Sequence, residues 1–380
     1  MKDLREGFTT GTAAAGAALA ALILLVERRA PENVSVPLPP YQFPSSCSGF
    51  ASVPVEYCRP LVRGGGKSFA SFGAEAAVRK DGGDDPDVTS GALISARVTL
   101  EPLRQDSPSD RGFVRLEGGR GVGRVTLPGL PVPVGEAAIN PVPREQMRVV
   151  LSRYVGRAAP RFGPCPPLSV VISVPGGEKL ALRTLNPRLG IVGGISILGT
   201  QGTVRPFSHA AWQATVSQGL KIALASGCST VCLSTGRRSE ALLMRRYPRL
   251  SPQSFIQAAD FAAFSLRAAG SMPFANIVWG CFFGKLLKLA QGMEYTHARE
   301  GDIDFEALAL LCSRSGVRCA DAVRRCSTAA QALEILLADR AGRPALKRVA
   351  RAAAGQAARF AGRAVTLNLF HADGGFLCAA

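Results

Sequence analysis

The chain has 380 residues, enough for two domains, because a single hydrophobic core seldom serves so long a chain. Hydrophobic residues make up 47% of it and aromatic residues 7%, which excludes a disordered chain and is typical of a folded globular protein. The net charge of +17 indicates a polyanionic partner: a nucleic acid, an anionic membrane or a small molecule with several carboxylates.

The first predicted element is a helix over residues 12–26, an apolar run rich in Ala and Leu. A span of 15 residues is shorter than the roughly 20 that cross a membrane. Asp3 and Glu6 stand where a secretory signal would carry positive charge. We therefore expect a buried helix capped by Thr10 or Thr12, no membrane association and a cytoplasmic protein.

Short β-like segments follow. Residues 31–63 are rich in Pro and Ser and contain "VSVPL" and "ASVPVEY", residues 92–100 form a good strand, and residues 102–111 form a polar loop. Further short strands alternate with Gly and Pro turns, which predicts an antiparallel sheet. A helix is expected over residues 144–155. The segment "APRFGPCPP" then suggests a boundary, giving an N-terminal α+β domain over residues 1–160.

Strands and helices alternate in the second half. Strands are expected at residues 168–174, 229–234 and 274–280, and helices at 207–227 and 254–269. More helices reach about Gly362, and a strand pair closes the chain. This order predicts a C-terminal α/β domain over residues 161–380 with a largely parallel sheet. Ligands of such sheets bind at the carboxyl ends of the strands, where we expect the loops 190–204, 234–240 and 280–285 to meet.

Residues 190–204 read "GIVGGISILGTQGTV", an apolar run interrupted by glycines. Glycine costs about 0.5–1 kcal/mol relative to Ala in a packed segment, so the backbone here is expected to approach something closely. Two interpretations stay open. The segment forms tight turns between buried strands, or its bare N–H groups line a ligand.

The segment "KDGGDDPDVTSG" at residues 80–91 gathers four Asp around Gly and Pro. A solvated turn explains this composition. A calcium loop is disfavoured because no Glu stands at the twelfth position. Alternatively, one carboxylate orients or deprotonates a substrate.

Other patterns argue against phosphate and metal sites. "GCFFGKLLKLA" lacks the Ser or Thr that follows Lys in a nucleotide-triphosphate loop. Ten cysteines form no Cys-x-x-Cys pair and only three His are present, so we expect buried free thiols and no metal site. His297, just after an apolar helix, fits either a helix-end hydrogen bond or catalysis, and His209 is expected to be structural. The scattered Lys and Arg and few aromatic residues also disfavour a nucleic-acid partner.

Five strings in register resemble the cobalt-precorrin-5B C1-methyltransferases of anaerobic cobalamin synthesis. They are "LREGFTTGTAAAGAALAA", "KDGGDDPDVTSGALISARV", "GVGRVTLPGLPVPVGEAAINPVPREQM", "LNPRLGIVGGISILGTQGTVRPFS" and "GKLLKLAQGMEYTHAREGDID". The closing "VTLNLFHADGGFLCA" is similar as well, so the resemblance covers nearly the whole chain.

The resemblance implies transfer of a methyl group from S-adenosylmethionine to ring carbon C1 of cobalt-precorrin-5B, giving cobalt-precorrin-6A. The cobalt then belongs to the substrate. Arg side chains suit a ring fringed with acetate and propionate groups, since guanidinium binds carboxylate bidentately. The alternatives are a non-catalytic scaffold of the corrinoid pathway and a basic nucleic-acid-binding protein. A homo-oligomer is compatible with the sequence.

Site roles follow from loop position within this resemblance. The catalytic candidates are Asp84, Asp85 and His297, and the substrate-binding candidates are Arg237, Lys285 and Thr296. The donor-binding candidates are Gly190, Gly193, Gly194, Gly199, Thr200, Gly202, Thr235 and Gly236.

The chain departs from the family pattern at three places. Ala13 stands where the family usually has Cys, Cys281-Phe282-Phe283 replaces Gly-His-Ile, and Ala298 replaces Ser. A thiol nucleophile at position 13 is thereby excluded, while His297 is retained.

Overall fold

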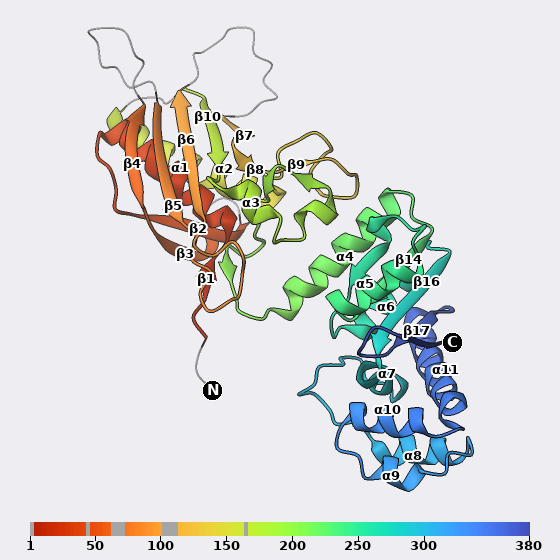
Figure 1. Ribbon diagram of the computed structural model, residues 1–380. Helices are drawn as coiled ribbons and strands as arrows, with labels where there is room; N and C mark the ends of the chain where they lie inside the picture. Colours follow the sequence, from red (N-terminus) through yellow and green to blue (C-terminus); the bar gives the residue numbers. More distant parts are fainter. Residues whose placement is uncertain (1–3, 43–45, 62–72, 101–112, 163–165) are drawn as a thin grey trace. The chain divides into compact units, whose positions relative to one another are not determined.

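The computed structural model describes residues 4–42, 46–61, 73–100, 113–162 and 166–380. The expected polar loop at 102–111 lies outside these residues. Contacts divide the chain into two compact units, Met1–Ser208 and His209–Ala380, each described here by itself. The mixed α/β class is confirmed: the first unit has mostly antiparallel sheets and the second a largely parallel one (Figure 1).

The core helix of the first unit is α1, Thr10–Glu27. It is long and apolar enough to cross a membrane, but 78% of it is buried inside the protein, where it packs against α2, β5 and β6. Its small side chains allow this close packing from several sides. The buried helix is confirmed, whereas the expected cap is wrong: Thr9 accepts a hydrogen bond from the Thr12 amide.

The main sheet of this unit has the order β4-β5-β6-β10-β7. Only β10 and β7 are parallel, and the other pairs are antiparallel. The ribbon β2–β3 and helix α2 complete the layer around α1. The bounds are β2 Asn33–Gln42, β3 Ser46–Pro54, β4 Tyr57–Leu61, β5 Gly73–Arg79, β6 Leu93–Leu100, β7 Val114–Gly118, β10 Leu168–Ser173 and α2 Pro141–Phe162.

Short paired strands join the remaining loops of the first unit. β1 pairs with β13, β8 with β12 and β9 with β11. The bounds are β1 Gly7–Phe8, β8 Gly121–Val122, β9 Arg124–Val125, β11 Ile191–Val192, β12 Gly194–Ile195 and β13 Thr203–Val204, with α3 Gly177–Ala181 and the 3-10 turn η2 Asn186–Leu189 between them.

The boundary between the compact units falls after Ser208, whereas the sequence placed it at 160/161. The reason is β10, which pairs with β6 and β7 of the first unit rather than opening the parallel sheet. Everything from β10 to β13 therefore belongs to the first unit. Residues 190–204 thus follow no strand of the parallel sheet, whereas residues 234–240 and 280–285 lie at the carboxyl ends of its strands β14 and β16.

The sheet of the second unit has the order β15-β14-β16-β17-β18, parallel except for β18. The closing antiparallel pair is confirmed. The helix expected over 254–269 is wrong in its first half, which forms β15 beside β14. The bounds are β14 Thr230–Ser234, η3 Pro252–Ser254, β15 Phe255–Gln257, β16 Asn276–Phe282, β17 Thr366–Phe370 and β18 Phe376–Ala379.

Helices cover this sheet and extend beyond it (Figure 1). The core lies where α6, α7 and α11 pack together around Trp279 and Leu367. The bounds are α4 His209–Ala225, α5 Arg237–Arg246, α6 Ala262–Gly270, α7 Phe283–Ala290, α8 Phe305–Ser313, α9 Ala320–Arg324, α10 Ala329–Ala338 and α11 Gly342–Ala361.

Candidate functional site

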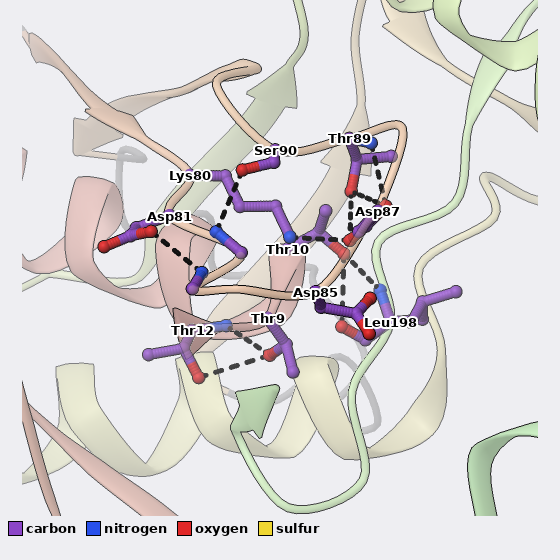
Figure 2. Close-up of polar contacts among 12 residues, drawn as sticks. Thr9, Thr10, Thr12, Lys80, Asp81, Asp85, Asp87, Thr89, Ser90 and Leu198 are labelled. Atoms are coloured by element: carbon purple, nitrogen blue, oxygen red, sulfur yellow. Dashed lines mark hydrogen bonds and ion pairs between the residues drawn. The ribbon is translucent and has the colours of Figure 1, made fainter. Parts of the chain in front are cut away.

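Three of the segments that carry the resemblance meet in the first unit: the start of the chain, the Asp-rich loop and residues 190–204 (Figure 2). Gly7 and Phe8 pair with β13, and the Phe8 amide also donates to the Asp81 carbonyl at 2.8 Å. The Asp84 amide donates to the Arg5 carbonyl at 3.0 Å. These three segments, the start of the chain from residue 5 to residue 12, residues 80–91 and residues 190–204, thus form one polar cluster. We call this cluster the motif junction.

Three threonines at the start of α1 hold the glycine segment in place, and Figure 2 shows the contact of Thr10 with Leu198. The buried Thr10 hydroxyl accepts from the Leu198 amide at 2.9 Å and donates to the Leu198 carbonyl at 3.1 Å. The Thr12 hydroxyl donates to the Gly202 carbonyl at 2.8 Å. Thr9 caps the helix, and its amide donates to the same carbonyl. These bonds fix Leu198 and Gly202 against the start of α1.

Close packing within the protein accounts for most of the glycines. A Cβ at Gly199 would lie 2.3 Å from the Thr9 hydroxyl oxygen, and one at Gly202 would lie 2.5 Å from a Leu38 methyl group. Both residues have positive φ, which side chains rarely adopt. Similar contacts face Gly190 and Gly194. The structure therefore favours the interpretation of tight turns for these four positions.

The outer side of the segment is different. A Cβ at Gly193 would meet nothing within 4 Å, and Gly193 and Thr200 are both exposed. Val192 and Leu198 beside them are 57% and 48% exposed. Bare backbone and apolar side chains thus face outward where the expected donor-binding residues lie.

The carboxylates of the Asp-rich loop have unequal tasks. Asp81 forms an ion pair with Arg5, and hydrogen bonds from Arg5 and from the Gly83 amide lower the pKa of Asp81. The exposed Asp84 accepts from the Arg5 amide at 2.8 Å. Asp85 accepts from the Phe207 amide at 3.1 Å through Oδ1. The second carboxylate oxygens of Asp84 and Asp85 remain available as acceptors.

A buried ion pair closes the loop, a feature that the sequence reasoning missed. Lys80 is 2% exposed, and its Nζ lies 2.7 Å from Asp87 Oδ2. Asp87 also accepts from the Thr89 amide and hydroxyl. Burial alone would raise the pKa of Asp87, but the Lys80 charge and these hydrogen bonds outweigh it and lower the pKa. The loop is therefore more than a solvated turn.

In the second unit, Thr235, Gly236 and Arg237 follow the carboxyl end of β14. The next strand in the chain, β15, lies on one side of β14, and the one after it, β16, lies on the other side. The order of strands in the sheet therefore changes direction at β14. Such switch points are where α/β sheets bind ligands. A Cβ at Gly236 would meet nothing within 4 Å, and Arg237 is exposed.

The structure brings together Lys285, Thr296 and His297. Lys285 forms an ion pair with Asp260, and its Nζ also donates to the Thr296 carbonyl at 2.6 Å. Thr296 is buried. The buried Lys288 donates to the His297 carbonyl at 2.5 Å. Lys285 and Thr296 are thus already engaged inside the protein, and they fix the loop that carries His297.

An aromatic cluster beside that loop was not expected from the sequence. The rings of Phe261 and Tyr295 lie 4.9 Å apart between their centroids, and the His209 ring packs against both. His297 stacks on Tyr295 at 5.9 Å. A cavity of about 550 Å³ opens beside His209, Phe261 and Tyr295. The signal that could have revealed it is weak, because these aromatic residues are far apart in sequence.

Across the parts of the chain that the structure describes, no group of three or more His, Cys, Asp or Glu is placed to hold a metal ion.

Comparison with known proteins places the chain among relatives. The CbiD family matches residues 1–206, and its C-terminal domain matches residues 295–380. The chain is 50% identical to the cobalt-precorrin-5B C(1)-methyltransferase of Nitratidesulfovibrio vulgaris, over 99% of this chain and 93% of that protein. It is 44% identical to the enzyme of the same name from Geobacillus kaustophilus, over 87% and 82%.

A crystal structure of a cobalamin biosynthesis protein (cbiD) from Archaeoglobus fulgidus is 27% identical, covering 75% of this chain and 79% of that one, with a TM-score of 0.37. Residues 1–206, which the CbiD family matches, include every segment of the motif junction. The chain belongs to the CbiD family.

Proposed function

We propose that this chain transfers a methyl group from S-adenosylmethionine to C1 of cobalt-precorrin-5B, giving cobalt-precorrin-6A in cobalamin synthesis. The observation that carries the proposal is the 50% identity, over nearly the full chain, to a relative named for that reaction. Most of the segments that carry the resemblance lie in the first unit, and three of them meet at the motif junction.

The chemistry requires alignment more than strong acid or base groups. The sulfonium of the donor is already activated, so the chain has to hold the methyl group in line with the ring carbon and exclude water. Holding two reactants in such a geometry contributes several kcal/mol. The rigid hydrogen bonding of the motif junction is suited to that task.

Two places are proposed for the donor. At the motif junction, Gly193 and Thr200 present exposed backbone and a hydroxyl, while Gly190, Gly194, Gly199 and Gly202 act through the fold by allowing close packing. In the second unit, Thr235 and Gly236 stand at the switch point of the sheet. Backbone amides at the start of α5 would suit the carboxylate of the donor's amino-acid part.

We also propose which residues contact the corrinoid and which accept the proton that the ring system releases. The exposed Arg237 can pair with a carboxylate of the ring. Asp84 and Asp85 each keep one carboxylate oxygen for an acceptor role, and His297 is held beside the aromatic cluster. Lys285 and Thr296 act by positioning that loop, since both are engaged within the protein.

The decisive experiment is turnover of cobalt-precorrin-5B with a donor labelled in its methyl group. Transfer of the label to the corrinoid supports the enzyme. Binding of both substrates without transfer would favour a scaffold, the alternative raised by the changes at Cys281 and Ala298. A nucleic-acid partner, suggested by the charge of +17, predicts salt-dependent binding to DNA or RNA, which we do not expect at physiological salt. We place the protein in the cytoplasm, where its proposed substrates are made.

A further inference from the structure

A hollow of about 610 Å³ lies in the second unit between α11 and the last strand, β18. The α11 residues come from the first half of that helix, and two further places in the chain, the end of α5 and the end of α10, complete the walls. None of the residues assigned a role above lines it. Its volume lies in the range of small-molecule sites.

Five cations line this hollow. Arg343, Lys347 and Arg351 are spaced four residues apart on α11, so they follow one face of the helix at steps of about 6 Å. Arg246 comes from the end of α5, and its guanidinium lies 3.7 Å from the centre of the Phe376 ring. Arg348 donates to the Arg314 carbonyl at 2.8 Å. The hollow is therefore a concentrated source of positive charge.

This charge is not compensated within the described part of the chain. No acidic residue is among those that line the hollow, and Arg246, Arg343, Lys347 and Arg351 make no ion pair with a described carboxylate. Elsewhere many arginines are paired, as Arg324 is with Glu306 and Asp321. Like charges held this close repel one another unless an anion binds between them.

The hollow also has an apolar side. Phe376 is 42% exposed, and Leu337, Leu346 and Leu377 contribute to the lining. Phe376 pairs with Phe370, the last residue of β17, so the hollow begins level with the carboxyl ends of the parallel strands. That edge is where ligands of such sheets bind. A ligand that fits both sides combines an apolar body with several anionic groups.

The spacing of the cations distinguishes kinds of anion. A single phosphate is best held by donors that converge on one point. Here three cations lie along a helix face at successive steps, which suits separate carboxylates distributed along one rim of a larger molecule.

We propose that the hollow between α11 and β18 is a polycarboxylate site that holds the acetate and propionate groups along one rim of the corrinoid. The class of ligand follows from the geometry of the hollow, and only its identification with the corrinoid rests on the proposed function.

Binding is tested first without turnover, with the full chain and uroporphyrin III, a fluorescent tetrapyrrole fringed by acetate and propionate groups. The variant R343Q/K347Q/R351Q is compared with R318Q/R325Q/R359Q, which removes the same charge at exposed positions outside the hollow. We expect the first variant to weaken binding roughly tenfold and to flatten its salt dependence, and the control to change binding less than about twofold. Equal loss in both variants would overturn the site. So would competition by inorganic triphosphate but not by benzenehexacarboxylate.

Steady-state turnover then separates this inference from the proposed function. We expect R343Q/K347Q/R351Q, called the pocket variant, to raise KM for cobalt-precorrin-5B roughly tenfold, with KM for S-adenosylmethionine unchanged. Normal kinetics in the pocket variant would refute the corrinoid site and leave the methyltransferase standing. Conversely, absence of methyl transfer by the wild type, with uroporphyrin binding still lost in the pocket variant, would refute the function and support the site.

Discussion

Replacing Asp87 by Asn tests whether the buried pair with Lys80 stabilises the motif junction. The change leaves the Lys80 ammonium, which is only 2% exposed, without its counter-charge. Breaking a fully buried pair costs about 3–5 kcal/mol, and an exposed pair contributes about 0–1 kcal/mol. Because the Asp87 side chain is 27% exposed, we expect a loss of about 2–3 kcal/mol in the free energy of unfolding of the first unit.

The assay is native-state hydrogen exchange of peptides from the first unit. Both tryptophans, Trp212 and Trp279, lie in the second unit, so their fluorescence during denaturation serves as an internal control that we expect to change little. Glu178→Gln is the matched variant, because it removes an exposed pair with Arg120 that solvent screens, so it is expected to change the free energy of unfolding little. A cost for Asp87→Asn no larger than that of Glu178→Gln would refute the reasoning.

The pH dependence provides a second test of the same pair. The folded pKa of Asp87 is lowered, so its contribution is present above the ordinary value near 3.8 and is lost as the pH falls through the lower, folded value. The difference between wild type and Asp87→Asn should therefore be constant at neutral pH and shrink in acid. A difference that grows on acidification would contradict this assignment.

Four further outcomes are expected. Gly202→Ala should destabilise the first unit by about 2–4 kcal/mol in urea denaturation, because positive φ and a close contact combine, whereas Gly193→Ala should cost about 1–2 kcal/mol from φ alone. Burial, together with Glu75, raises the pKa of Tyr57 to about 12. The phenolate absorbance that the wild type gains and Tyr57→Phe lacks should therefore appear near that pH. The free energy of unfolding should decline as the pH rises from 10 toward 12. Burial likewise raises the pKa of Cys281 to about 12, so iodoacetamide at pH 8 should label this thiol only after unfolding. Asp85→Asn should lower kcat by about tenfold to a hundredfold with unchanged stability, and full activity in this variant would remove Asp85 from the mechanism.

Much of the fold could be predicted because periodicity and turn residues report local structure directly. The buried helix α1, the closing pair β17–β18 and the parallel strands β14 and β16 follow from apolar runs bounded by Gly, Pro and Asp. β10 shows where this reasoning ends. Its apolar pattern predicts a strand, but the choice of partner depends on β6 and β7, which lie far away in sequence.

The candidate site was predictable in part for the same reason. The glycines of residues 190–204 indicate a close approach, but the sequence does not indicate that Thr9 and Leu38 are the groups approached. Similarly, the Asp-rich segment gives no sign that Lys80 is buried against Asp87. Lys285 of α7 and Thr296 are only 11 residues apart, and the Lys285 ammonium donates to the Thr296 carbonyl, a contact between side chain and backbone that the sequence does not indicate.

The most direct test of the account is the position of the methyl group delivered by the purified chain. Incubation with cobalt-precorrin-5B and S-adenosylmethionine carrying a ¹³C-methyl group should give one new methyl signal bonded to C1 of the corrinoid by NMR. Label at another ring carbon, or an unlabelled corrinoid after both substrates have been shown to bind, would contradict it.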